Sequence, residues 1–148
     1  MRPARLVVLL AVALAPCALL VAPSRASSSV AFRVIVNASN ATTVVERRFL
    51  AEAFLKKTTR WADGSVIRPV DLDAESGVRR RFSEDVLGRS VSAVKNYWQQ
   101  VVFSGRDLPP AELDTDDEVI QFVAKHEGAV GYVSGTASVD RVKTLTMK

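Results

Sequence analysis

The chain has 148 residues and a formal charge of +4, from 20 Lys and Arg residues and 16 Asp and Glu residues. The first 26 residues hold three of the basic residues and none of the acidic ones, so the rest of the chain is close to neutral. A near-neutral chain argues against nucleic-acid binding, which needs a clustered basic face.

Residues 1–26 have the three parts of a secretory signal. A short basic start is followed by an apolar run over residues 6–22, and Ser24-Arg25-Ala26 offers small residues for cleavage. We therefore expect a signal peptide that is cleaved near Ala26, and one periplasmic or secreted domain over residues 27–148. The alternative is an uncleaved N-terminal segment that anchors the protein, because the apolar run is close to membrane-spanning length.

The single cysteine, Cys17, lies in that apolar run. The residues around it resemble a bacterial lipoprotein box, but Pro16 stands where Gly or Ala is usual, so we do not expect a lipid on the thiol. Cleavage after Ala26 would leave a domain without cysteine, which folds without disulfides.

Strands and helices alternate along the rest of the chain. Hydrophobic periodicity predicts strands near residues 32–36, 66–72, 129–133 and 142–147. Helix signals predict helices within residues 43–57, 76–88, 90–105 and 115–128. Gly131, inside a buried strand, indicates a close approach of another part of the chain. This alternation, with no internal repeat, predicts one α/β domain.

Capping signals define the predicted helix starts. Thr43-Val-Val-Glu46 and Thr115-Asp-Asp-Glu118 have the spacing of a capping box, in which two side chains satisfy free backbone N–H groups. Ser90 or Ser92 is expected to begin the helix predicted within residues 90–105. Residues 106–114, which include two consecutive prolines, are predicted to be an extended connection.

The stretch from Arg68 to Phe82 predicts a strand, a turn of small residues and a helix. Ser76 is a favourable N-cap, and Gly77 lets a ligand approach the backbone. The free N–H groups of the first turn and the side chain of Arg79 are suitable donors for an oxyanion such as phosphate. The alternative is an ordinary capped helix with solvated arginines at 79–81, and this segment taken alone favours that alternative.

Catalysis has little support in the sequence. The single histidine, His126, stands at a predicted helix end beside Glu127, where a surface position near the helix dipole is the simplest interpretation. A lone histidine cannot form a metal cage, and no spacing of carboxylates singles out a general acid and base. We therefore expect no enzyme, no metal site and no cofactor.

Three segments, in this order, resemble the phosphate-binding proteins of ABC-type phosphate transporters. Residues 54–64 resemble the family's F-x-G-K-x-T-x-W-x-D/N segment, residues 71–82 its anion-binding turn, and residues 127–133 its P-G-A-I-G-Y-V segment. The resemblance is closest to short, single-lobe members. It implies a three-layer α/β/α domain like one lobe of a type II periplasmic binding protein, with the strand at residues 32–36 near the centre and a helix on each face.

The resemblance, together with the turn chemistry, assigns a candidate oxyanion site. Its expected ligands are the Ser76 hydroxyl, the N–H groups of Gly77 and Val78, and the guanidinium of Arg79. A carboxylate of Asp71 or Asp73 would accept the proton of hydrogen phosphate.

The sequence departs from the family at this turn and in its extent. The full-length proteins have D-G-S-G-T here, so Val78 replaces the threonine, Glu75 the first glycine and Ala74 the aspartate. The resemblance covers the second of the two lobes that enclose phosphate in those proteins. An anion held by one lobe stays half exposed to water, where charged hydrogen bonds are weaker.

These observations lead to three hypotheses. The first is a non-enzymatic binding protein for phosphate or a similar oxyanion, connected with ABC-type phosphate transport and partnered by a transporter permease or another envelope protein. The second is a single-lobe interaction or assembly module of the cell envelope with little ligand affinity. The third is a sensor in which a partner supplies the other half of the cleft. The sequence leaves the oligomeric state open.

Overall fold

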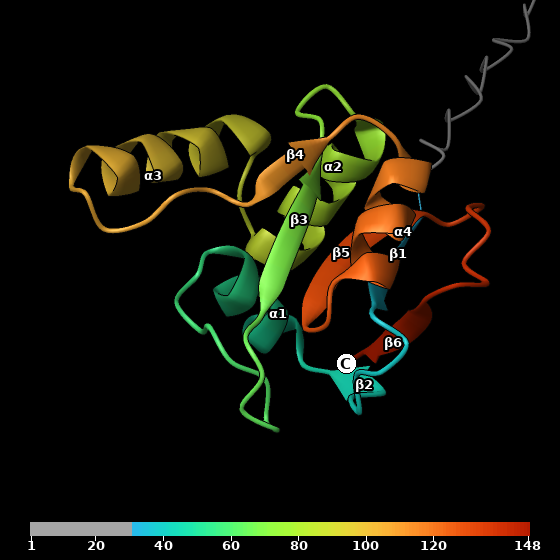
Figure 1. The fold of residues 1–148 in the computed structure, drawn as a ribbon. Helices are drawn as coiled ribbons and strands as arrows, with labels where there is room; N and C mark the ends of the chain where they lie inside the picture. Colours follow the sequence, from blue (N-terminus) through green and yellow to red (C-terminus); the bar gives the residue numbers. More distant parts are fainter. Residues whose placement is uncertain (1–30) are drawn as a thin grey trace, which may run out of the picture.

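The computed structural model describes residues 31–148 (Figure 1). The predicted signal peptide and Cys17 lie outside these residues. Within the described part, no helix is both long and apolar enough to cross a bilayer. The elements are, in order, β1 (Phe32–Val36), β2 (Val44–Val45), α1 (Arg47–Phe54), β3 (Arg68–Leu72), α2 (Gly77–Phe82), the π-helical segment η1 (Ser83–Leu87), α3 (Val91–Phe103), β4 (Ala111–Leu113), α4 (Asp116–Lys125), β5 (Ala129–Ser134) and β6 (Lys143–Met147).

The six strands form one mixed sheet with the order β2-β6-β1-β5-β3-β4. β1 pairs antiparallel with both β5 and β6, so it lies inside the sheet as the sequence predicts. β3 runs parallel to β5 on one side and to β4 on the other. Parallel neighbours bring the carboxyl ends of β3 and β4 to the same edge of the sheet, beside the start of α2.

Helices cover both faces of this sheet (Figure 1). Gly131 of β5 faces α4, because a Cβ atom there would lie 2.7 Å from Val119 Cγ1. The next residue, Tyr132, points to the opposite face and stacks on Phe82 of α2 with a ring-centroid distance of 3.8 Å. The successive side chains of β5 therefore alternate between two helical layers. This arrangement confirms the predicted three-layer α/β/α fold and the close approach at Gly131.

Aromatic rings form the part of the core beneath α2. Phe82 and Tyr132 are fully buried and stack nearly parallel. Phe32 meets Phe82 edge-on at 5.5 Å, and Phe54 of α1 lies 4.7 Å from the same ring. Such contacts add to the free energy gained by removing large apolar surfaces from water. They fix α2 against the centre of the sheet.

α3 projects away from the body of the domain (Figure 1). Val94, Trp98 and Val101 are buried along one side of this helix. Its C-terminal end and the connection that follows carry exposed apolar side chains. Phe103 is 91% exposed and Leu108 is 65% exposed. The sequence predicted a helix here but not that its end would stand clear of the core.

The first predicted capping box is wrong. Val44 and Val45 form strand β2 and pair with β6, and α1 begins only at Arg47. Glu46 occupies the N-cap position but makes no side-chain capping bond. The carbonyl oxygen of Thr43 instead accepts from the backbone N–H of Thr146 at 2.9 Å. Pairing with a strand distant in sequence satisfies the backbone that a local cap would have satisfied.

The other cap predictions fare better. Ser90, and not Ser92, is the N-cap of α3, and its side chain accepts from the N–H of Ala93 at 3.2 Å. Thr115 caps α4 by accepting from the N–H of Glu118. The Glu118 carboxylate, however, accepts from Asp114 and not from the cap residue itself, so the box is only half formed.

The predicted connection at residues 106–114 contains the edge strand β4, which was not predicted from the sequence. β4 has three residues and pairs with β3 through Ala111 to Leu113. A strand of that length is too short for an alternating pattern to be recognised. The predicted helix at 76–88 is present as α2 and η1, and Gly88 ends it with φ of +62°.

We predict that Gly128→Ala lowers the free energy of unfolding far more than Gly105→Ala does. Both glycines have positive φ, +74° and +66°, so each substitution costs about 1–2 kcal/mol in backbone strain. A Cβ at Gly128 would also lie 2.1 Å from the carbonyl oxygen of Val66, whereas nothing lies within 4 Å at Gly105. Urea unfolding of both variants measures the difference. Equal losses would contradict the tight backbone approach at Gly128.

Candidate functional site

The turn between β3 and α2 is built from local hydrogen bonds. Ser76 has extended backbone angles, and its side chain accepts from the N–H of Arg79 at 3.4 Å. Asp73 stabilises the turn before it, because its carboxylate accepts from the N–H of Glu75 at 2.9 Å. A helix start leaves its first N–H groups without intrahelical partners, which here include those of Gly77 and Val78. The predicted cap is confirmed, and two donors remain at this turn.

The guanidinium of Arg79 lies inside the protein. Its side chain is 4% exposed, and Nη1 lies 2.9 Å from Asp71 Oδ1. Nη1 also donates to the carbonyl oxygen of Leu72 at 2.9 Å, while Nη2 lies 3.8 Å from a carboxylate oxygen of Glu112. The arginine that the sequence assigned to a ligand is therefore already bonded to three groups of the two adjoining strands.

Asp71 is the centre of a buried polar group. The Tyr132 hydroxyl donates to its Oδ1 at 2.8 Å and accepts from the N–H of Leu72 at 3.3 Å. Burial raises the pKa of the Asp71 carboxyl from its usual 3.8 to about 6, although the Arg79 charge and the Tyr132 hydrogen bond oppose the rise. Burial and the nearby Asp71 charge likewise raise the pKa of the Tyr132 phenol. The candidate residue Asp71 thus lies beneath the turn, while Asp73 lies in it.

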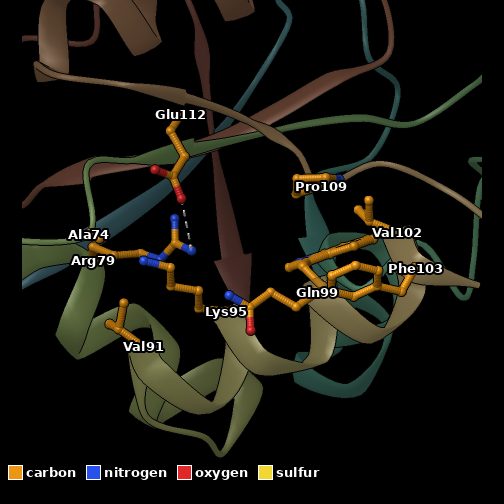
Figure 2. A pocket seen from close by; sticks show the side chains of 10 residues that line it. Ala74, Arg79, Val91, Lys95, Gln99, Val102, Phe103, Pro109 and Glu112 are labelled. Carbon is orange, nitrogen blue, oxygen red and sulfur yellow. Dashed lines mark ion pairs between the residues drawn. The ribbon is translucent and has the colours of Figure 1, made fainter.

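A cavity of about 520 Å³ adjoins the turn, and we call it the α3 pocket (Figure 2). One wall comes from α3, and the other from the turn after β3, the first turn of α2, Pro109 and Glu112 of β4. Figure 2 shows Glu112 above the guanidinium of Arg79, with Lys95 and Gln99 reaching in from α3. The other residues that line the pocket are mainly apolar, namely Ala74, Val91, Trp98, Val102, Phe103 and Pro109.

His126 takes no part in this site. It follows the last turn of α4, where its Nδ1 lies 2.7 Å from the carbonyl oxygen of Phe122 and its ring stacks on the Phe122 ring. Within residues 31–148, no group of three or more His, Cys, Asp or Glu side chains is placed to hold a metal ion.

Three residues near the site were not anticipated from the sequence, namely Glu112, Tyr132 and Lys95. A signal for the contact between Asp71 and Tyr132 exists in hindsight, but none exists for Glu112. Asp71 lies between two apolar residues of a buried strand, and a buried carboxylate requires a cation and further donors. Tyr132 lies among the buried apolar residues of β5, and a buried hydroxyl needs a partner. Nothing in the local sequence places Lys95 beside Arg79.

No protein-family model matches this sequence, and no curated protein matches it either. Solved structures do match its fold. An ABC-type phosphate transport receptor from Vibrio cholerae has a TM-score of 0.62 and 19% identity, over 80% of this chain and 46% of the receptor. A phosphate ABC transporter substrate-binding protein from Clostridium perfringens, with bound phosphate, has a TM-score of 0.63 and 18% identity, over 80% and 45%. PstS from Borrelia burgdorferi has a TM-score of 0.57 and 14% identity, over 80% and 47%.

The chain therefore spans less than half the length of the proteins that it matches. At identities of 14–19% the likeness establishes the fold, which is that of a single domain of a periplasmic binding protein. It confirms the resemblance expected from the three sequence segments. The Vibrio cholerae and Clostridium perfringens structures are of phosphate-transport proteins.

We predict that Arg79→Met destabilises the protein by about 3–5 kcal/mol, because it leaves the buried Asp71 carboxylate without its cation. Arg80→Met is the matched control, since Arg80 is exposed on the same helix and should cost less than about 0.5 kcal/mol. Chemical unfolding of both variants provides the measurement. Adding Asp71→Asn to Arg79→Met should recover part of the loss, and similar losses for the two single variants would argue against a buried pair.

The pKa of Asp71 predicts how stability depends on pH. Between pH 3.8 and about 6 the folded protein binds a proton that the unfolded chain releases, so the free energy of unfolding falls as pH rises. The stabilisation from this proton is complete below pH 3.8 and is lost as pH passes about 6. The melting temperature of the wild type should therefore fall relative to that of Asp71→Asn as the pH rises from 4 to 7. A difference that stays constant, or moves the other way, would refute the raised pKa.

Proposed function

We propose that this protein binds phosphate or a similar oxyanion at the turn between β3 and α2, in connection with ABC-type phosphate transport. The observation that carries the proposal is the fold, which matches phosphate-transport proteins over 80% of the chain. The turn supports it independently, since a Ser-capped helix start with two N–H groups free of intrahelical partners suits an anion.

Each residue of the candidate site has a role in this proposal. Gly77 and Val78 donate backbone N–H groups, and the Ser76 hydroxyl donates its proton while its oxygen accepts from Arg79. Asp73, the carboxylate in the turn, accepts a hydrogen bond from the P–OH group of hydrogen phosphate. Asp71 and Arg79 act from below, where their ion pair holds the end of β3 against the first turn of α2.

We place the protein in the periplasm or outside the cell, following the signal peptide predicted for residues 1–26, with the uncleaved anchor as the alternative. A transporter permease is the partner that phosphate uptake requires. The proposal includes no catalysis, metal or cofactor.

A second function, as an interaction module of the envelope, is favoured by the exposed end of α3. Phe103 is 91% exposed and Leu108 is 65% exposed, and Val102 beside them is 43% exposed. Exposed apolar groups that cluster in this way mark protein contact sites more often than chance. This function requires no affinity for an anion at the turn.

Calorimetry with phosphate, sulfate and arsenate tests the proposal. Ser76→Ala should weaken phosphate binding about tenfold, because it removes a hydrogen bond to a charged ligand. Ser90→Ala is the matched control, since Ser90 also caps a helix but lies outside the turn. Binding should weaken as salt increases, because the site is open to water. If the purified protein gives no heat with millimolar phosphate, sulfate or arsenate, the interaction module becomes the better explanation.

A further inference from the structure

We infer that the α3 pocket receives an apolar organic group attached to the bound oxyanion, so that the preferred ligand is a phosphate monoester with a small apolar or aromatic substituent. The inference rests on the proposed function, because the phosphoryl group itself would lie at the adjoining turn. It adds a second contact region, on α3, that inorganic phosphate does not use.

The pocket and the turn share one wall. Ala74 lines the pocket and stands two residues before Ser76, and Arg79 lines it from the first turn of α2 (Figure 2). A phosphoryl group at the turn would therefore lie beside the pocket, so that a substituent on it can extend toward α3. Cavities of about 300–1,000 Å³ are typical of sites for small organic ligands, and the α3 pocket has about 520 Å³.

The walls favour an apolar substituent. Val91, Trp98, Val102 and Phe103 line the pocket from a single helix, and Pro109 closes it from the segment before β4. Val102 and Phe103 are largely exposed to water in the absence of a ligand. An apolar group placed against them would remove their surface from water as well as its own.

The charges favour an anion over a neutral molecule. Lys95 lines the pocket and forms no ion pair within residues 31–148, whereas the charge of Arg79 is already balanced by the buried carboxylate of Asp71. Glu112 contacts Arg79 only at 3.8 Å and is half exposed, so it can turn toward water. A bound anion would give Lys95 the charged partner that the described residues do not supply.

The test compares inorganic phosphate, phenyl phosphate and phenol by calorimetry on the purified protein. Phenyl phosphate should bind about tenfold tighter than inorganic phosphate, because its ring is buried in the pocket, and phenol should bind too weakly to measure. The ring should also change the fluorescence of Trp98, which lines the pocket, but not that of Trp61, which lies elsewhere in the core. Trp98→Phe should abolish that change.

Two pairs of variants locate the contacts. Val102→Asn should remove most of the preference for phenyl phosphate without changing the affinity for inorganic phosphate, whereas Val44→Asn, at a similarly exposed valine on β2, should change neither. Lys95→Ala should weaken binding of phenyl phosphate about tenfold, and Lys125→Ala, at the end of α4, should leave it unchanged.

Failure of the inference differs from failure of the proposed function. Equal affinities for inorganic and phenyl phosphate, or a preference that survives Val102→Asn, would overturn the pocket assignment while the oxyanion site stands. If inorganic phosphate at millimolar concentration gives no heat of binding, that result would count against the oxyanion site itself.

Discussion

The ion pair between Asp71 and Arg79 is the interaction on which the rest of the site depends. It joins β3 to α2, and through Tyr132 and Glu112 it also reaches β5 and β4. Two buried charges cost much desolvation free energy, which is offset only where geometry and further hydrogen bonds are good. The Tyr132 hydroxyl and the Leu72 carbonyl supply those bonds. The position of the turn above this pair is therefore fixed from below by groups of three strands.

Local signals were sufficient for most of the fold. β1, β5 and β6 could be predicted because apolar residues repeat in them, and Ser76, Ser90 and Thr115 because a cap acts within one helical turn. β2 and β4 could not, because strands of two and three residues have no period of their own and exist through their partners. The Thr43 cap failed for the same reason, since β6 lies a hundred residues further along the chain.

In the candidate site too, residues held by their neighbours in sequence could be predicted, and contacts with distant residues could not. Ser76, Gly77 and Val78 belong to a turn whose conformation is set by neighbours in sequence, and the prediction placed them correctly at a helix start. The direction of the Arg79 side chain depends on Asp71 and Tyr132. Asp71 is close to Arg79 in the sequence, but Tyr132 is not, so its contribution could not be predicted. A long charged side chain ordinarily keeps its head group in water, and here the ion pair with the buried Asp71 carboxylate holds the guanidinium in the core.

The pairing of β1 has a consequence for how the chain matures. Its two neighbours, β5 and β6, both come from the last twenty residues of the described chain, so the centre of the sheet joins segments about a hundred residues apart. Contacts of such high sequence separation form slowly. The centre of the sheet therefore cannot form while β5 and β6 are still being synthesised, and β1 gains its native neighbours only at the end of the described chain.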